Sequence, residues 1–237
     1  MQTTLFRKEV VAEGTLRFWF TRPEGFEYTA GQSIDLTLVN PPETDAEGNT
    51  RAYSLVSIPS EGELSITTRL RDTAFKRVLE KLEPGATFEI EGPFGSFFLH
   101  ENTARAAVFL MGGIGVTPAY SIIRDATAQG LPHKIYLFYS NRRPEDTAFL
   151  EELQSLAEAH SNFIFVPTMT QMDQSTEVWE GERGYISEEL IKKYATNAQN
   201  PIYYLAGPAE MVVAMRDVLN GMGVSNDDIR TEEFTGY

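Results

Sequence analysis

The pattern of apolar residues changes near residue 100, and this change limits the folds open to the chain. Before it, short alternating segments such as 15–20 and 33–39 are separated by turn residues, which is typical of antiparallel strands. After it, unbroken apolar runs alternate with amphipathic stretches of helical period, which indicates a parallel sheet covered on both faces. The sequence therefore predicts an antiparallel Greek-key β-barrel in residues 1–100 and an α/β domain with a parallel sheet in residues 101–237.

The individual elements follow from the same patterns. Strands of the barrel are expected at 15–20, 33–39, 52–57, 63–70 and 86–91. Thr73 suits the N-cap of one helix, which ends before Pro84 and Gly85. Strands of the second domain are expected at 106–111, 134–139, 163–167 and 201–205, and helices near 118–129, 146–159, 187–195 and 208–222.

Composition narrows the possible chemistry. The 237 residues include no cysteine, which excludes disulfides, thiolate zinc sites and thiolate-bound iron–sulfur clusters in this polypeptide. Redox chemistry would therefore need a non-covalent organic cofactor. A net charge of -14 argues against binding to nucleic acid, because an acidic surface repels the phosphate backbone.

The remaining general features are those of a soluble protein. No apolar run reaches the ~20 residues of a membrane-spanning helix, and the first residues lack the plan of a signal peptide. We therefore expect a cytoplasmic protein with no integral membrane segment. His100, His133 and His160 lack metal-ligand spacing, so we expect surface positions for all three and no metal site.

A glycine-rich turn, Gly112-Gly113-Ile114-Gly115-Val116-Thr117-Pro118, follows the first apolar strand of the second domain. Glycines let backbone amides approach a ligand closely, and the positive end of the next helix favours an anion. This segment is therefore a candidate seat for a pyrophosphate at the carboxyl edge of the sheet. The alternative is a tight strand-to-helix turn without a ligand.

A second candidate segment is Arg51-Ala52-Tyr53-Ser54 in the barrel. An arginine can grip a phosphate with its guanidinium fork, and a tyrosine can stack on a flat ring. Taken alone, the segment is also explained by an arginine that forms a surface salt bridge next to a tyrosine of the barrel.

Five motifs in a fixed order resemble those of the ferredoxin–NADP reductase superfamily, over essentially the full length. They are Arg51-Ala-Tyr-Ser54, Gly92-Pro-Phe-Gly-Ser-Phe97, Gly113-Ile-Gly-Val-Thr-Pro118 with its preceding glycine, Ala206-Gly-Pro208 and Glu233-Phe-Thr-Gly-Tyr237. The resemblance implies FAD bound by the barrel and NADP(H) or NAD(H) bound by the α/β domain.

The resemblance also implies roles for barrel residues. Arg51 would hold the FAD pyrophosphate, Tyr53 would pack on the isoalloxazine, and Ser54 would hydrogen-bond the N5 region. The flavin edge and phosphate side would be lined by Thr67, Thr68 and Arg69, and the amides at the helix start would meet the pyrophosphate, namely those of Thr73, Ala74 and Phe75. Many relatives have a glycine and a serine at this helix start, where this chain has Arg71-Asp72-Thr73-Ala74.

In the α/β domain, the resemblance assigns the dinucleotide to the glycine turn and to two later segments. Contacts are expected from Gly113, Gly115, Val116, Thr117, Ser140, Arg142, Arg143, Gly207 and Pro208. Arg142 and Arg143 would favour NADP(H) by holding its 2′-phosphate, or would instead pair with nearby carboxylates such as Asp146, which leaves NAD(H) open. Ala206 replaces the cysteine that many relatives carry near the hydride-transfer point.

The end of the chain leaves alternatives open. Phe234 or Tyr237 would lie against the flavin, or Phe234 would be buried in a last strand with Tyr237 frayed. Glu233 is expected in the catalytic set with Tyr53 and Ser54, for proton transfer near N5. Glu232 is the neighbouring candidate, and either carboxylate would alternatively be solvated.

The function implied by the resemblance is hydride transfer from NADPH or NADH to FAD, followed by single-electron release to a separate carrier such as ferredoxin or flavodoxin. A basic patch of Arg69, Arg71, Lys76 and Arg77 would steer an acidic partner. Alternatives are a reductase component or electron-relay subunit of a multicomponent complex, a free flavin or ferric reductase, and a nucleotide-binding module without flavin.

Overall fold

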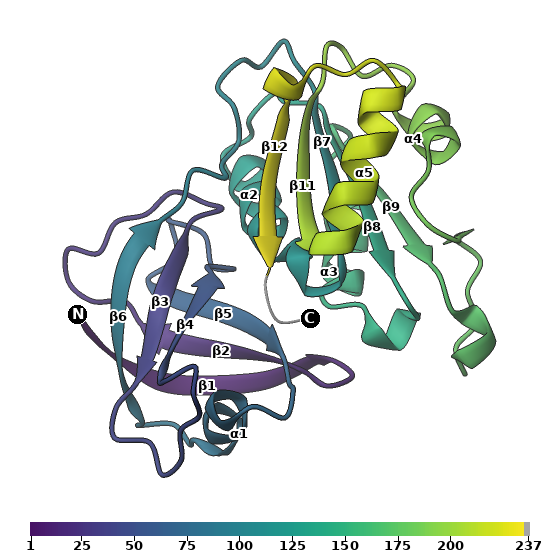
Figure 1. Cartoon of the computed structure of the whole chain (residues 1–237). Helices are drawn as coiled ribbons and strands as arrows, with labels where there is room; N and C mark the ends of the chain where they lie inside the picture. Colours follow the sequence, from purple (N-terminus) through teal and green to yellow (C-terminus); the bar gives the residue numbers. More distant parts are fainter. Residues whose placement is uncertain (235–237) are drawn as a thin grey trace.

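Two sheets of different type lie side by side in the molecule (Figure 1). The computed structural model describes the backbone of residues 1–234 and the side chains of residues 1–232. An antiparallel sheet built from the first part of the chain is followed by a parallel sheet with helices on both faces. The predicted fold class is therefore confirmed.

The first part is a six-stranded antiparallel sheet in the order β4-β3-β6-β1-β2-β5. Its strands are β1 (Gln2–Ala12), β2 (Thr15–Thr21), β3 (Ser33–Leu38), β4 (Thr50–Ser54), β5 (Glu63–Arg69) and β6 (Thr87–Phe94). A single bridge between Leu55 and Ile66 joins the two outer strands, so the sheet curls into a barrel. Phe20 and Phe88 meet edge to face in its core, with ring centroids 5.2 Å apart.

One helix, α1 (Ala74–Lys81), covers an end of this barrel. The Thr73 hydroxyl accepts a hydrogen bond from the Lys76 amide, which confirms Thr73 as the N-cap. Phe75, Val78 and Leu79 are buried against the barrel core, as their spacing on one helix face requires.

The second part is a six-stranded sheet in the order β10-β9-β8-β7-β11-β12, with every neighbouring pair parallel. Its strands are β7 (Ala107–Gly112), β8 (Ile135–Asn141), β9 (Phe163–Met169), β10 (Glu182–Arg183), β11 (Ile202–Pro208) and β12 (Ile229–Phe234). Its helices are α2 (Val116–Ala128), α3 (Leu150–Ala159), α4 (Glu188–Ala195) and α5 (Ala209–Gly221), and short 3-10 turns lie at Gly113–Gly115, Pro144–Asp146, Met172–Gln174 and Asn226–Asp228.

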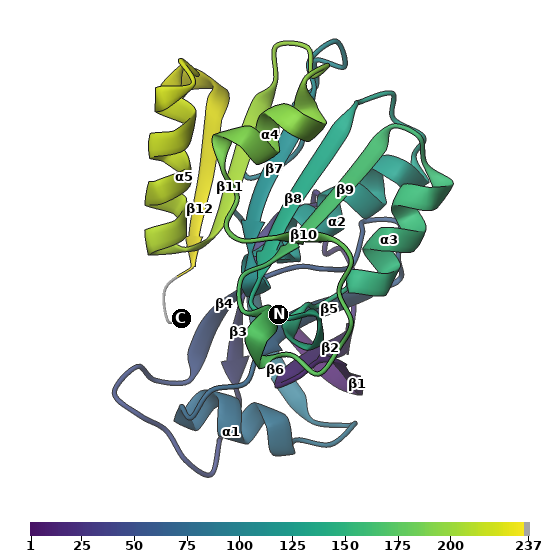
Figure 2. The ribbon, with the colours of Figure 1, turned by 90° about the vertical axis from the view of Figure 1, so that its right-hand side faces the viewer.

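The helices of the parallel sheet divide between its two faces (Figure 2). Residues of α2 and α3 share one core with Phe109 and Tyr204 of the strands, and residues of α4 and α5 share another with Val108 and Leu205. Because the order of strands reverses between β7 and β11, the connections that follow these strands lead to α2 and α5 on opposite faces of the sheet. Ligands of such sheets bind at the carboxyl edge beside this point.

The structure differs from the sequence prediction at several elements. β1 was not expected, since its eleven residues mix buried and exposed positions without clean alternation. Helix α3 begins later than the expected residue 146, because Pro144 opens a 3-10 turn and Phe149 takes a left-handed conformation with φ 61. No helix within residues 1–234 is long and apolar enough to cross a membrane.

Contacts between the two sheets fix their relative position. The Ser121 hydroxyl of α2 donates to the Ser57 carbonyl at 2.7 Å, and Arg124 pairs with Glu61. At the turn between β1 and β2, the Glu13 amide donates to the Glu145 carbonyl at 2.8 Å. These bonds hold the barrel against the face of the α/β domain that carries α2.

Candidate cofactor site

Buried hydroxyl groups without partners gather where β4 and β5 end. Ser54 and Thr67 are each 4% exposed, and the Leu55–Ile66 bridge sets them opposite each other across the two strands. Within the described part of the chain, neither hydroxyl has a hydrogen-bond partner. Buried polar groups are normally satisfied, so this cluster fits a bound group that supplies hydrogen bonds, as the polar edge of a flavin does.

The ring of Tyr53 contacts another aromatic ring. Its ring lies 6.1 Å from that of Phe75 at the start of α1, tilted by 40°. Burial raises the pKa of the Tyr53 hydroxyl to about 12, so this group stays protonated and can donate. A fixed, neutral ring of this kind can pack on a flat heterocycle.

Arg51 is held by the loop between β3 and β4. Its guanidinium donates to the carbonyls of Glu47, Gly48 and Thr50 and pairs with the carboxylates of Glu47 and Asp45, at 2.9 and 3.3 Å. Its expected role as a pyrophosphate ligand therefore requires these contacts to be shared or exchanged.

Asp45 also binds the start of α1. One of its oxygens accepts from the Ala74 amide at 3.1 Å, and the other accepts from the Glu47 amide at 3.0 Å. Burial opposes ionisation of Asp45, but these amides and Arg51 outweigh it and lower its pKa. The Thr73 amide donates to the Arg71 carbonyl. A carboxylate thus bonds to Ala74 and Arg51, two of the groups that the family resemblance assigns to the FAD pyrophosphate.

Across the crevice, the glycine turn packs against the end of β11. A Cβ atom placed on Gly115 would lie 2.5 Å from the Cα of Gly207, so the two loops cross with room only for glycine. The side chains of Val116 and Thr117 are buried in the core, and only their backbone remains for a ligand. Gly113 has a φ of 50, which glycine adopts without strain.

A cavity of about 660 Å³ lies at this edge of the sheet, and we call it the nucleotide pocket. Both parts of the chain line it. Its walls include Arg69, Leu70, Arg71, Gly112, Gly113, Ser140, Asn141, Arg142, Thr170, Tyr185, Ile186, Pro208, Glu210, Met211, Ala214 and Met215. The structure thus brings together five of the predicted residues, namely Arg69, Gly113, Ser140, Arg142 and Pro208, and adds Asn141, Thr170 and Tyr185, which were not expected.

The two arginines after β8 have different surroundings. Arg143 forms two hydrogen bonds with Asp146, at 2.9 and 3.1 Å, and a third with Glu13 of the barrel at 2.9 Å. Arg142 lines the nucleotide pocket and lies 3.6 Å from Asp146, with its side chain 54% exposed. Arg142 can therefore reach a ligand, whereas Arg143 joins the domains.

Glu232 lies beside Ala206 in the register of β11 and β12. One of its carboxylate oxygens is buried and has no hydrogen-bond partner among the described residues. Burial raises the pKa of Glu232 to about 7, so it can hold or release a proton near neutral pH. The side chains of Glu233 and Phe234, and the whole of Tyr237, lie outside the described residues.

The expectation that the histidines lie on the surface is wrong for two of them. His100 is 6% exposed and His133 is 3% exposed. The His100 ring bonds to the Tyr204 hydroxyl at 2.9 Å, and His133 Nε2 donates to the His100 carbonyl at 2.8 Å. The loops that carry them fold back on the parallel sheet, which local sequence does not reveal. His160 is only half-buried.

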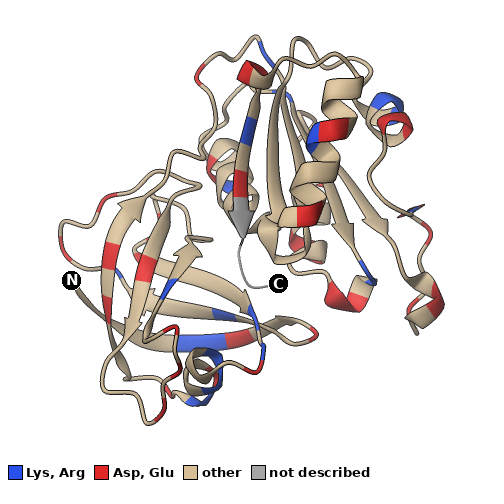
Figure 3. Cartoon of the chain, viewed as in Figure 1, with Lys and Arg blue, Asp and Glu red and all other residues tan. Residues whose placement is uncertain are grey.

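The expected basic patch is only partly retained. Lysines and arginines do gather on α1 and the neighbouring strand (Figure 3), but Arg77 pairs with Glu43 and Asp72. Lys76 donates to the Arg69 carbonyl at 2.8 Å. Burial, reinforced by nearby arginines that include Arg71, lowers its pKa to about 8.

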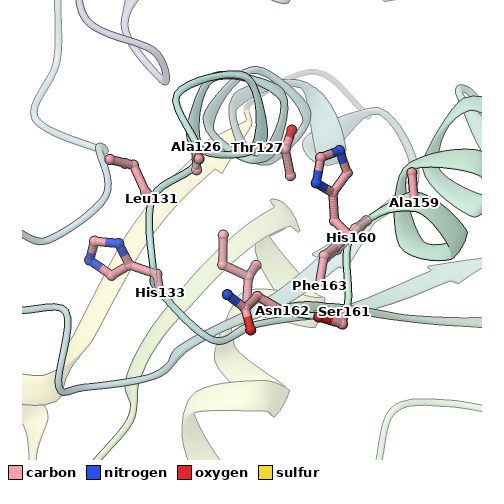
Figure 4. A pocket seen from close by; sticks show the side chains of 11 residues that line it. Ala126, Thr127, Leu131, His133, Ala159, His160, Ser161, Asn162 and Phe163 are labelled. Atoms are coloured by element: carbon pink, nitrogen blue, oxygen red, sulfur yellow. The ribbon is translucent and has the colours of Figure 1, made fainter.

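A smaller cavity of about 210 Å³ lies at the opposite edge of the parallel sheet (Figure 4). It is bounded by the ends of α2 and α3 and by the first residues of β8 and β9, including His160 and Asn162. None of the residues expected to bind a cofactor lines it.

Comparison with known proteins agrees with this geometry. Residues 2–99 match the model of the oxidoreductase FAD-binding domain, and residues 109–217 match that of the oxidoreductase NAD-binding domain. The chain is 31% identical to the reductase component DmpP of phenol 2-monooxygenase from Pseudomonas sp. (strain CF600), over 90% of this chain and 59% of that protein. It is 29% identical to ferredoxin–NADP reductase B from Sorangium cellulosum (strain So ce56), over 91% of this chain and 89% of that protein.

The fold also matches a solved structure, a ferredoxin NADP+ reductase from Neisseria gonorrhoeae with bound FAD and NADP. The TM-score is 0.79 at 24% identity, covering 98% of both chains. The chain spans about 60% of the length of the first curated relatives that it matches. The paired FAD-binding and NAD-binding domains, in this order and with this fold, place the chain in the ferredoxin–NADP reductase superfamily of FAD- and NAD(P)-dependent oxidoreductases.

Proposed function

We propose that this protein takes a hydride from NADPH or NADH and passes single electrons to a separate redox carrier. The observation that carries the proposal is the nucleotide pocket, whose walls come from β5 of the barrel and from the glycine turn of the α/β domain. A nucleotide in that pocket would meet a flavin held at the ends of β4 and β5. FAD supplies the exchange between two-electron and one-electron chemistry, and the protein aligns the two cofactors.

The barrel residues have roles that their surroundings support. Ser54 and Thr67 offer buried hydroxyls to the polar edge of the flavin, and Tyr53 offers its ring. Arg51 and the Ala74 amide offer positive charge and a hydrogen bond to the pyrophosphate, once Asp45 gives way.

Glu232 is our candidate for holding a proton near the reacting atoms. Its buried oxygen and raised pKa are supported by the described structure, and it lies beside Ala206, where hydride transfer is expected. Glu233 keeps the role that its motif implies as a sequence-based expectation.

The nucleotide preference depends on Arg142. Because Asp146 and Glu13 occupy Arg143, we propose that Arg142 is the residue that holds a 2′-phosphate. A single exposed arginine is a weak selector, so we expect both nucleotides to be used, with a preference for NADPH that Arg142→Ala removes.

We propose a cytoplasmic protein whose acceptor is a separate carrier, such as a ferredoxin, a flavodoxin or an oxygenase component. The described relatives include the reductase component of phenol 2-monooxygenase and a ferredoxin–NADP reductase, which supports an acceptor of this class. These 237 residues hold no cysteine for a thiolate-bound cluster, so such a cluster would lie outside them.

Anaerobic rapid mixing of FAD-loaded protein with NADH and NADPH tests the proposal. We expect bleaching of the flavin absorbance by both nucleotides, followed by reoxidation when an acceptor protein is added. A protein that takes up no FAD would instead be a nucleotide-binding module. Rapid bleaching with reoxidation only by free flavin or ferric complexes would favour a small-molecule reductase. Failure of the isolated chain to turn over with any acceptor would favour an electron-relay subunit.

A further inference from the structure

Helix α2 connects the nucleotide pocket to the barrel. It begins at Val116, directly after the glycine turn whose Gly112 and Gly113 line the pocket. Its side chains Ser121 and Arg124, about 8 and about 12 Å along the helix axis from its start, bond to the barrel. Because a helix moves as one rigid element, these contacts help to fix where the glycine turn lies relative to the barrel.

The barrel partners of these two side chains all lie in the loop between β4 and β5. Arg124 forms an ion pair with Glu61 at 2.5 Å and also donates to the Val56 carbonyl at 3.3 Å. The Ser121 hydroxyl donates to the Ser57 carbonyl at 2.7 Å. One helix of the α/β domain is thus joined to one loop of the barrel.

This loop is braced inside the barrel. Ser57 is fully buried, and its hydroxyl accepts from the Tyr28 hydroxyl at 2.9 Å and from the Ser65 amide at 3.0 Å. The Glu61 carboxylate also accepts from the Ile58 amide at 3.0 Å. A displacement of α2 is therefore passed on to the strands beside the loop rather than absorbed by it.

The same strands carry the residues expected at the flavin. Ser54 ends β4 immediately before the loop, and Thr67 lies on β5, the strand after it. Their buried hydroxyls, which lack partners among the described residues, fit the polar edge of a flavin. The loop thus links the flavin end of the barrel to the helix that begins at the nucleotide pocket.

The contact between Glu61 and Arg124 carries a charge on each side. The two side chains are 28% and 24% exposed, so both charges are partly removed from water, where a charge-assisted contact is strong. Loss of one partner would leave the other charge unpaired at the interface. Neither residue lines the nucleotide pocket, so a role in the reaction would act through position.

Hydride transfer requires the reacting atoms to lie about 3 to 3.5 Å apart. We propose that the Glu61–Arg124 ion pair is a positioning contact that holds the nicotinamide at this distance from the flavin. The inference rests on the proposed reductase function. Because the bonds of Arg143 and Arg69 across the interface remain when the pair is lost, we expect a displaced nicotinamide rather than separated domains.

Arg124→Met and Glu61→Gln test the proposal by anaerobic stopped-flow mixing of FAD-loaded protein with NADPH. We expect the rate constant of flavin reduction at saturating NADPH to fall about tenfold, because a misplacement of about 1 Å can cost a hundredfold. The charge-transfer absorbance that forms when nicotinamide stacks on flavin should weaken, which is a readout separate from turnover. Affinities for FAD and, by calorimetry, for NADP+ should stay the same, because the residues expected to bind them are retained.

Two further variants show whether the two residues act as a pair. The double variant should reduce its flavin no more slowly than either single variant, because the contact is already lost in each. Arg124→Lys keeps the positive charge and should recover part of the rate.

Arg105→Met is the matched control. Arg105 pairs with Asp228 at 2.7 Å, with side chains 26% and 33% exposed, but these two residues precede strands β7 and β12 of the same sheet. The variant should lower the melting temperature about as much as Arg124→Met does, while flavin reduction stays unchanged. A general loss of stability is thereby separated from a change in alignment.

An unchanged reduction rate in Arg124→Met, an equal loss in Arg105→Met, or a loss explained by weaker nucleotide binding would overturn the proposal. Additive losses in the double variant would also overturn it. Wild-type protein that binds FAD and NADPH but whose flavin is not reduced would refute the proposed function, and this inference with it. Failure of the ion pair to position the nicotinamide can thus be told apart from failure of the chain to act as a reductase.

Discussion

Replacing Glu232 by glutamine should change the pH dependence of stability in a defined direction. Burial raises the pKa of Glu232 from 4.5 to about 7, while the unfolded chain keeps the ordinary value. A carboxyl group whose pKa is higher in the folded state than in the unfolded state stabilises the native state through its protonated form. This contribution is complete at pH values below the unfolded-state pKa, and it is lost as the pH rises through the folded-state pKa. Glutamine carries no charge and therefore removes this loss.

The magnitude follows from the pKa values. Each pH unit between them corresponds to about 1.4 kcal/mol, so Glu232→Gln should gain up to about 3 kcal/mol of unfolding free energy relative to wild type. The two proteins should be equally stable at pH values well below the unfolded pKa of the carboxyl. The difference should then grow with pH and level off above neutral pH.

Urea unfolding of FAD-loaded wild-type and Glu232→Gln proteins across this pH range measures the difference directly. FAD affinity is determined for both proteins so that the contribution of FAD binding to each free energy of unfolding can be subtracted. Glu158→Gln, at an exposed position of α3, is the control and should follow the wild type at every pH. A difference between Glu232→Gln and wild type that does not vary with pH, or that shrinks as pH rises, would refute the reasoning.

Two further predictions concern the charged groups around the flavin end of the barrel. Asp45→Asn should bind FAD several-fold more tightly in a fluorescence titration of the flavin-free protein, because it no longer sets a negative charge against the pyrophosphate at Ala74 and Arg51. Weaker binding would show instead that Asp45 organises the site. Lys76→Gln should slow reduction of an acidic acceptor protein at low salt while flavin reduction by NADPH is retained, whereas Arg77→Gln should change neither rate, since Glu43 and Asp72 already neutralise Arg77. Equal effects of the two variants in stopped-flow traces would contradict this.

The parts of the fold that the sequence predicts correctly are those decided by local patterns. Unbroken apolar runs became the central strands of the parallel sheet, and Thr73 caps its helix because a hydroxyl there bonds to an amide three residues on. β1 was not predicted because its buried and exposed residues do not alternate along the strand. The left-handed Phe149 at the start of α3 reflects tertiary packing, since its ring stacks on Tyr120 with centroids 3.9 Å apart.

The site was predicted less completely, because its decisive contacts join residues that lie far apart in the chain. Arg142 and Arg143 are equivalent in sequence, and their roles are separated by contacts of the fold. One of these joins Arg143 to Glu13, which lies 130 residues away. Asn141 lies in the same motif, and its burial results from tertiary packing, which no local pattern shows. His100 was misjudged for the same reason, since its partner Tyr204 lies 104 residues further on.

The loop after β8 that carries Arg142 and Arg143 also joins the two domains. Asp146, 4% exposed, holds Arg143, and its carbonyl accepts from Arg69 of the barrel at 3.1 Å. Arg143 in turn reaches Glu13. Because Arg69 also lines the nucleotide pocket, the contacts that join the domains and the walls that receive the nucleotide are continuous. Hydride transfer requires the nicotinamide and the flavin to be held at a short and fixed distance from each other. We therefore expect that Arg143, in a motif that the resemblance links to nucleotide choice, helps to set the relative position of the two domains.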